Sequence, residues 1–241
     1  MKFLLSFCFV AFATSLAAAT PTVSDIVNRA RATVGTESAL DGMITLQMTG
    51  GLEPADSKMP AATLLIVARK PCSQRLEIKI DDIVETTILN GENGCLIRSN
   101  LHAGASQMRQ LTAPEFARVA FSTRQFFSFY RPDFKNGERI TYEGVEQRHG
   151  VRSHKLLYTY PDGISTVRYF SVNEDALVST ITDNGVESVS VGVQNVGGIR
   201  FPERIEYYEN GEEIHTIVLT KIIVNKPLME GIFDLPKAEE K

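Results

Sequence analysis

The sequence predicts a mainly β protein of the α+β type, built on one curved antiparallel sheet with two main helices. Many segments alternate apolar and polar residues, as strands with one buried face do. Turn sequences such as Asn-Gly separate these segments at the spacing of consecutive hairpins. Helical periodicity is too rare for a parallel sheet of βαβ units. These three observations predict eleven or twelve strands.

Residues 1–19 have the pattern of a cleaved secretory signal peptide. Lys2 precedes an apolar run over residues 3–12, and residues 17–19 are the small alanines that signal peptidase accepts. The run is shorter than the roughly 20 apolar residues of a membrane helix, although an uncleaved anchor is the alternative. No cysteine follows the expected cleavage site for lipid modification. We therefore expect residues 20–241 to form one soluble domain, secreted across the inner membrane.

Composition and motifs exclude several function classes. With 43% hydrophobic and 22% charged residues, the chain can bury a substantial core. Its net charge of −4 argues against binding a nucleic acid. It contains no G-x-S-x-G, H-E-x-x-H, Walker or G-x-G-x-x-G motif, so we expect no cofactor, no metal site and no enzymatic activity. The alternative is a hydrolase whose residues converge only in three dimensions, with a base among His102, His149, His154 and His215.

The expected elements begin with a helix that Ser24 caps and Gly35 ends. From residue 44 the pattern changes to a period of two residues, and residues 44–50 pair with residues 63–69 in a hairpin with a long polar tip. A meander then follows, because its strands are separated by the turn sequences Asp-Asp and Asn-Gly. Its strands are expected at residues 76–80, 84–89 and 95–99.

Residues 112–130 interrupt the strands and predict the second main helix. Thr112 can cap it, Pro114 lies in its first turn, and apolar residues recur three and four positions apart. Late strands such as residues 214–219 are apolar on both faces, so part of the sheet must be covered. The aromatic-rich helix is the candidate cover, either as a permanent plug or as a removable lid over a ligand cavity.

A curved sheet under an aromatic helix favours the binding of an apolar ligand by burial of surface. The alternative is that the aromatic side chains fill the interior themselves. Residues expected to line the cavity or form the lid come from the second helix and two early strands: Phe116, Val119, Phe121, Phe126, Phe127, Phe129, Tyr130, Leu64, Ile66, Leu76 and Ile78. The candidate polar contacts are Arg69, Arg75 and Arg124.

Cys72 and Cys95 are the two cysteines of the expected mature chain. In an oxidising compartment such a pair is more often a disulfide than two free thiols. Both residues fall on expected strands, and a bridge requires Cα atoms within about 7 Å. The sequence therefore leaves a Cys72–Cys95 disulfide and two free thiols as alternatives.

Short motifs occur along nearly the whole mature chain, at residues 30–35, 39–41, 70–71, 75–77, 87–91, 142–144, 158–163, 198–205 and 232–236. The last of them ends in Phe-Asp-Leu-Pro. Together these motifs resemble the outer-membrane lipoprotein-sorting proteins, the family of the periplasmic lipoprotein carrier. The resemblance implies an unclosed antiparallel barrel of about eleven strands, whose concave face is covered by helices and holds acyl chains.

The same resemblance implies a periplasmic carrier or binding protein for acyl chains of lipoproteins or lipids. Such a chaperone would deliver them toward the outer membrane, with membrane-bound donor and acceptor proteins as partners. We expect a monomer. In the carrier an arginine on an early strand holds the lid closed, and Arg69 and Arg75 lie in the corresponding region. The alternative is a non-enzymatic envelope protein with a structural or interaction role and a self-filled barrel.

Overall fold

The computed structural model describes residues 21–236, so the expected signal peptide lies outside the described residues. Its helices are α1 (Val23–Val34), α2 (Glu37–Asp41), α3 (Ala113–Ser128) and the 3-10 helix η1 (Phe134–Asn136). The early strands are β1 (Thr45–Pro54), β2 (Ala62–Arg69), β3 (Ser73–Ile80), β4 (Ile83–Asn90), β5 (Asn93–Asn100) and β6 (Ala105–Gln110). The late strands are β7 (Arg139–Arg148), β8 (Val151–Thr159), β9 (Ser165–Ser171), β10 (Leu177–Thr182), β11 (Val186–Val191), β12 (Gln194–Val196), β13 (Ile199–Phe201), β14 (Arg204–Glu209) and β15 (Glu212–Val224).

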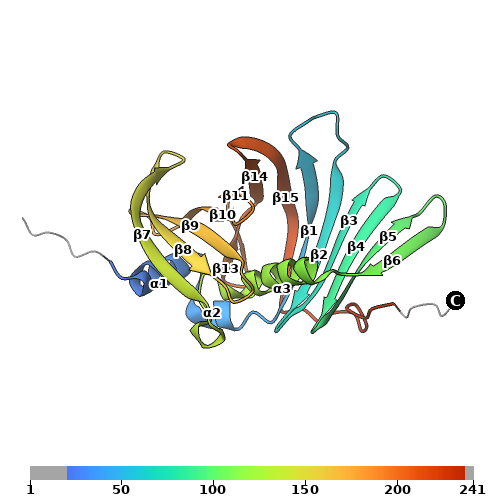
Figure 1. Cartoon of the computed structure of the whole chain (residues 1–241), viewed down its shortest axis with the longest axis horizontal. Helices are drawn as coiled ribbons and strands as arrows, with labels where there is room; N and C mark the ends of the chain where they lie inside the picture. The colour runs from blue at the N-terminus through green and yellow to red at the C-terminus, as the bar shows by residue number, and fades with distance from the viewer. Residues whose placement is uncertain (1–20, 237–241) are drawn as a thin grey trace, which may run out of the picture.

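Thirteen strands form one antiparallel sheet in the order β6-β5-β4-β3-β2-β1-β15-β14-β11-β10-β9-β8-β7 (Figure 1). The edge strands β6 and β7 do not pair with each other, so the sheet is unclosed. Strand β1 lies beside β15, which joins the two ends of the chain at the centre of the sheet. The remaining strands, β12 and β13, form a separate ribbon.

The predicted mainly β, antiparallel and unclosed architecture is confirmed, but the predicted number of strands is too low. Strand β6 has the polar sequence ASQMRQ, and all six of its residues are exposed. Strands β12 and β13 have three residues each. An exposed polar strand shows no apolar alternation, and three residues are too few to establish a period of two, which explains why the pattern missed them.

Both main helices are present, and their caps set where they begin. Helix α1 starts before the predicted cap at Ser24, because Thr22 accepts a hydrogen bond from the Asp25 amide and the Asp25 carboxylate accepts one in return. Thr112 precedes α3 as predicted, and its amide donates to the Glu115 carboxylate over 2.8 Å. The hydrogen bond from Arg109 and those from Thr112 lower the pKa of Glu115 to about 2.

Helices α1 and α3 pack on one face of the sheet, here called the inner face. Under α3, Phe127 packs with Leu46, Met48 and Ala68 in one apolar core. A second core joins α1 to the late strands and includes Ile26, Val27, Ala30, Leu156, Tyr158 and Phe170. None of the helices in the described part of the chain is both long and apolar enough to cross a bilayer.

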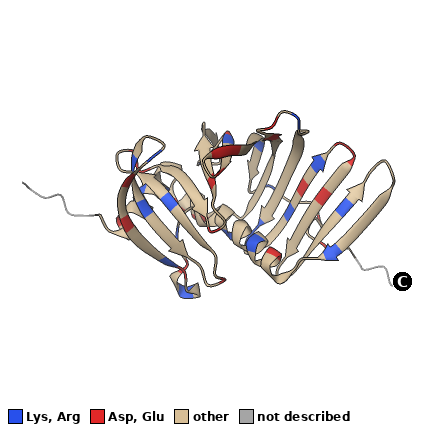
Figure 2. Cartoon of the chain, turned by 45° about the horizontal axis from the view of Figure 1, so that its top comes forward, with Lys and Arg blue, Asp and Glu red and all other residues tan. Residues whose placement is uncertain are grey.

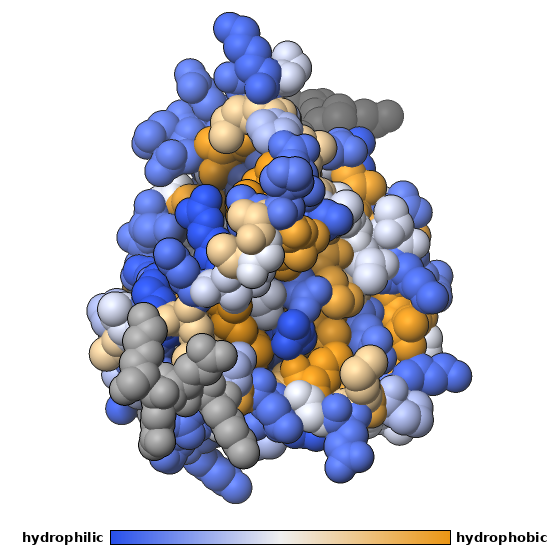
Figure 3. Space-filling model, turned by 90° about the vertical axis from the view of Figure 1, so that its right-hand side faces the viewer, coloured by the Kyte–Doolittle hydropathy of each residue, from blue (hydrophilic) through white to orange (hydrophobic). Residues whose placement is uncertain are grey.

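The opposite, outer face is covered in part by the segment that follows β15. Phe233 is buried there, and the Arg69 guanidinium lies over its ring at 5.0 Å. Charged residues of both signs are spread over the sheet, and neither sign forms a continuous face in Figure 2. Viewed from the side of β6, hydrophobic residues lie among hydrophilic ones at the surface (Figure 3).

Candidate ligand cavity beneath helix α3

A cavity of about 310 Å³ lies on the inner face, between the C-terminal half of α3 and the sheet. Its volume is at the lower end of the range for small-molecule sites, and most of its lining is apolar. The apolar part of the wall includes Leu46, Met48, Phe201, Ile205 and Leu219. The polar part includes Thr166, Arg168, Thr180, Thr182 and Ser188 from neighbouring strands β9, β10 and β11.

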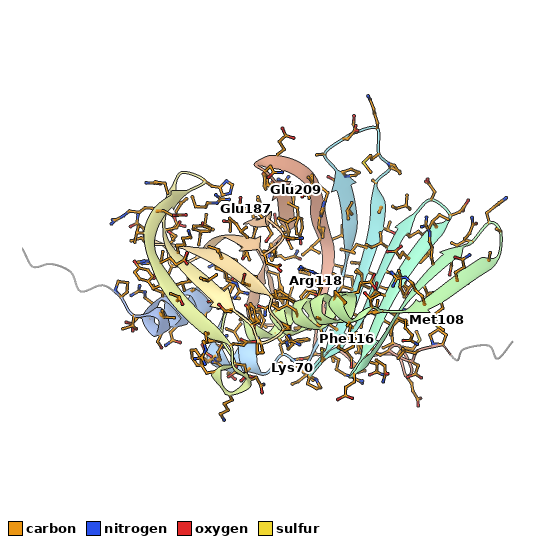
Figure 4. All side chains as sticks on the ribbon, in the orientation of Figure 1. Lys70, Met108, Phe116, Arg118, Glu187 and Glu209 are labelled. Atoms are coloured by element: carbon orange, nitrogen blue, oxygen red, sulfur yellow. The ribbon has the colours of Figure 1, made fainter. Side chains whose placement is uncertain are left out.

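The structure divides the predicted lid residues into two groups. Four of them line the cavity: Phe121, Phe126, Phe129 and Tyr130. The other three, Phe116, Val119 and Phe127, do not line it. Phe127 points into the core under the helix, whereas Phe116 and Val119 belong to the N-terminal half of α3, which continues toward β3 and β4 (Figure 4). Helix α3 is longer than the cavity, so only the apolar side chains of its C-terminal half can lie over it.

The predicted early-strand residues lie on the inner face but outside this cavity. Leu64 pairs with Ile78 and Ile66 pairs with Leu76, so the four side chains form one apolar patch across β2 and β3. Ile66 packs against the core under α3. None of these four side chains belongs to the wall of the cavity.

The predicted polar contacts Arg69 and Arg75 were wrong, because both side chains lie on the outer face. Arg69 stacks on Phe233, and Arg75 pairs with Glu77 over 2.5 Å. Alternation along a strand already excludes them, since odd-numbered residues of β2 and β3 face away from Leu64 and Leu76. Arg124, on α3, pairs with Asp162 and does not line the cavity.

The disulfide alternative is also corrected, because Cys72 and Cys95 are both free thiols. The Cys72 sulfur lies 3.9 Å from the Ala120 carbonyl oxygen of α3, on the inner side. Cys95 is opposite Ile88 in the β4–β5 pair, and its charged neighbour is the outer-face residue Arg75. Burial raises the pKa of both thiols, as expected for structural cysteines.

A buried arginine that the sequence analysis missed fixes the C-terminal end of α3. The side chain of Arg31 in α1 is 1% exposed, and its Nη1 donates to the carbonyl oxygens of Ser128 at 2.7 Å and Phe129 at 2.9 Å. Its Nε and Nη2 donate to the Glu37 carboxylate at 2.9 and 2.8 Å. The hydrogen bond from Arg31 lowers the pKa of Glu37. The signal was present, because Arg31 interrupts the apolar face of α1 one turn after Val27.

The contacts of Arg31 matter for the cavity because they hold an unusual turn. Phe129 and Tyr130 both have left-handed backbone angles, with φ of 43° and 70°. Non-glycine residues in this region carry strain that the surrounding structure must offset. Since both side chains line the cavity, Arg31 sets the shape of its wall from outside it.

Two ion pairs connect α3 to the turns of the late strands. Arg118, marked in Figure 4, donates to the Asp183 carboxylate in the β10–β11 turn at 3.0 and 3.1 Å. Arg124 donates to Asp162 in the β8–β9 turn at 3.0 Å. Both arginines are roughly half exposed, and exposed pairs contribute about 0–1 kcal/mol each. These two pairs, here called the rim pairs, are weak attachments of the helix.

A scan of protein-family models found no match, and no curated protein matches the sequence. Solved structures do match. They include a DUF1329 family protein from Desulfovibrio piger, with 9% identity and a TM-score of 0.58 over 89% of this chain and 98% of that chain. A LolA superfamily protein from Nitrosomonas europaea has 12% identity and a TM-score of 0.56 over the same shares.

A domain described as an outer membrane lipoprotein-sorting protein, from Vibrio parahaemolyticus, has 6% identity and a TM-score of 0.57. That match covers 86% of this chain and 94% of the other. The chain has the LolA-like fold. The resemblance inferred from the short motifs is therefore confirmed for the fold.

Proposed function

We propose that this protein is a soluble periplasmic carrier or binding protein for acyl chains of lipoproteins or lipids. Residues 20–241 would act as one half-barrel domain that carries its cargo toward the outer membrane. The observation that carries this proposal is the mainly apolar cavity beneath α3. The secretion pattern of residues 1–19 and the LolA-like fold support the compartment and the kind of cargo.

The proposed mechanism needs no bond chemistry. An acyl chain enters the cavity beside the C-terminal half of α3, and the rim pairs yield as the helix moves. About ten buried methylenes would gain roughly 8 kcal/mol, more than the two exposed ion pairs contribute. Release to an acceptor reverses these steps. Binding is therefore reversible and driven by the burial of apolar surface.

The cavity does not favour the alternative of a hydrolase. No histidine of the described chain belongs to its lining, so the base that this alternative requires is not placed there. The other alternative is an envelope interaction protein that uses a strand edge. Strand β6 supplies an exposed edge for it, because all six of its residues are accessible and one side is unpaired.

The deciding experiment is native mass spectrometry of the mature protein purified from a Gram-negative periplasm, followed by solvent extraction and lipid analysis. The expected result is an acylated species that travels with the protein. A bare protein mass that stays unchanged after incubation with lipids and lipopeptides would overturn the proposal. It would favour the interaction protein with a filled interior.

Removing both rim pairs is expected to speed ligand entry. In the variant Arg118→Gln/Arg124→Gln, the association rate of a fluorescent fatty-acid probe should rise severalfold, because α3 loses its two ion pairs with the turns of the late strands. The free energy of unfolding should fall by less than about 2 kcal/mol in total. Stopped-flow fluorescence measures the rate. The matched control is Arg109→Gln, whose ion pair with Glu115 joins β6 to α3 without touching the late strands. Equal association rates in both variants would contradict the role of the rim pairs.

A further inference from the structure

Arg168 is a buried cation whose contacts are all uncharged. Arg168 is 5% exposed, and its Nη2 donates to Gln125 Oε1 at 2.5 Å and to the Tyr160 hydroxyl at 3.2 Å. Its guanidinium carbon lies 4.2 Å from the centre of the Tyr158 ring and 5.7 Å from that of Tyr130. Among residues 21–236, no carboxylate lies within ion-pair distance of it. A buried charge is normally paired, so this arrangement is incomplete by itself.

The surrounding phenols cannot neutralise the guanidinium. Burial raises the pKa of Tyr158 to about 12 and also raises the pKa of Tyr130. Both hydroxyls are therefore protonated and uncharged at neutral pH. Arginine remains charged in proteins under all ordinary conditions. The positive charge of Arg168 is stabilised by ring faces and dipoles only.

Arg168 lies in the wall of the cavity, beside a second incomplete group. Thr166, two residues earlier on β9, also lines the cavity, and its buried hydroxyl has no hydrogen-bond partner in the described structure. Thr180 pairs with Arg168 and Thr182 pairs with Thr166 across β9 and β10. One wall of the cavity therefore combines a cation, an unused hydroxyl and further threonine side chains.

The opposite part of the cavity is apolar. Leu46 and Met48 come from β1, Leu219 from β15, and Phe129 from the turn after α3. A ligand that satisfied both parts would have a hydrocarbon chain and an anionic head. An acyl chain without a charged head would fill the apolar part, but Arg168 would still have no anionic partner and the Thr166 hydroxyl no hydrogen-bond partner.

We propose that the cavity selects acyl amphiphiles with one anionic oxygen head, a carboxylate or a phosphate. Arg168 binds the anion, Thr166 donates a hydrogen bond to it, and the chain lies against β1 and β15. This inference rests on the proposed function and narrows its cargo class: an acidic lipid is preferred over an acyl chain with a neutral head.

The test compares three probes with the same chain length by isothermal titration calorimetry: palmitate, hexadecyl phosphate and hexadecanol. The wild-type protein should bind at least one of the two anions tenfold or more tightly than hexadecanol. The tighter of the two identifies the head as carboxylate or phosphate. In Arg168→Gln the affinity for that anion should fall about 10- to 100-fold, the effect of losing a charged hydrogen bond. Hexadecanol binding should stay close to the wild-type value.

Two further variants keep the test valid if Arg168→Gln folds poorly. Thr166→Val removes a hydroxyl that has no partner, so it should fold like the wild type and still weaken anion binding. Arg168→Lys keeps the charge and should retain part of the preference for the anion. Arg152→Gln, an exposed arginine on β8, is the control and should change neither affinity.

Each outcome bears on a different statement. If the wild type binds hexadecanol as tightly as both anions, the selectivity for acidic lipids is overturned and the proposed acyl carrier stands. Unchanged anion binding in a folded Thr166→Val or Arg168→Gln variant overturns the assigned residues. If none of the three probes binds, the proposed function fails as well.

Discussion

Replacing Arg31 by methionine is expected to lower the free energy of unfolding by about 2–4 kcal/mol. The Ser128 and Phe129 carbonyl oxygens would both lose their charged donor: Phe129 would be left unsatisfied, at about 1–3 kcal/mol for a buried polar group, whereas Ser128 would keep the hydrogen bond from the Arg131 amide. Glu37 would lose less, because its side chain is 53% exposed and it also pairs with Arg131. Urea unfolding followed by circular dichroism measures the change.

The same variant should weaken acyl binding, because Phe129 and Tyr130 line the cavity in a turn that Arg31 holds. The matched control is Arg29→Met on the same helix. Arg29 is half exposed and pairs with Asp175, so its loss should cost less than about 1 kcal/mol. If Arg31→Met is as stable as Arg29→Met, the turn after α3 does not depend on Arg31.

The dependence of stability on pH gives an independent check on Arg31. Its hydrogen bond lowers the pKa of Glu37 in the folded state below the ordinary value of 4.5. The unfolded chain therefore takes up a proton at higher pH than the folded chain does. The contribution of ionised Glu37 to the stability of the folded protein is present above about pH 4.5 and is lost as the pH falls through the folded pKa. As the pH is lowered from 5 to 3, the free energy of unfolding should therefore fall less in Arg31→Met than in the wild type.

The sequence predicts the regular elements well because their signals are local. The amphipathic pattern of α1, the cap and proline of α3 and the Asn-Gly turns each depend on a few neighbouring residues. The position of β1 beside β15 depends instead on residues more than 150 positions apart, as in the pairing of Leu46 with Val224. Local patterns carry no information on that pairing.

The polar parts of the site were missed for a related reason. Arg31 and Arg168 acquire their roles from partners on distant elements, namely Ser128 for Arg31 and Gln125 and Tyr158 for Arg168. Arg69 and Arg75 could have been excluded, because strand alternation places them opposite the predicted cavity residues. The sequence predicts that the aromatic segment lines a cavity, but which of its rings reach the space beneath α3 depends on the geometry of the helix and on the turn that Arg31 holds.

Phe126 and Phe127 allow a direct test of which rings reach the cavity, because these neighbours differ in burial and only one of them lines it. Phe126 lines the cavity and is half-buried at the edge of the core, whereas Phe127 is 9% exposed and lies within that core, packed with Leu46, Met48 and Ala68. Phe127→Asp should remove most of the folding free energy, since loss of a buried phenylalanine costs about 3–5 kcal/mol before the charge is counted.

Phe126→Asp should leave a folded protein and lower its affinity for an acyl chain by at least about 100-fold. A carboxylate in the wall of an apolar cavity disfavours the burial of a hydrocarbon chain against it. Titration with a fluorescent fatty-acid probe measures the loss. Because a new carboxylate also repels an anionic probe, displacement by hexadecanol is measured in parallel. Phe126→Leu keeps the wall apolar and should bind nearly as the parent does. A folded Phe126→Asp variant that binds both ligands as tightly as the parent would show that acyl chains are held elsewhere than beneath α3.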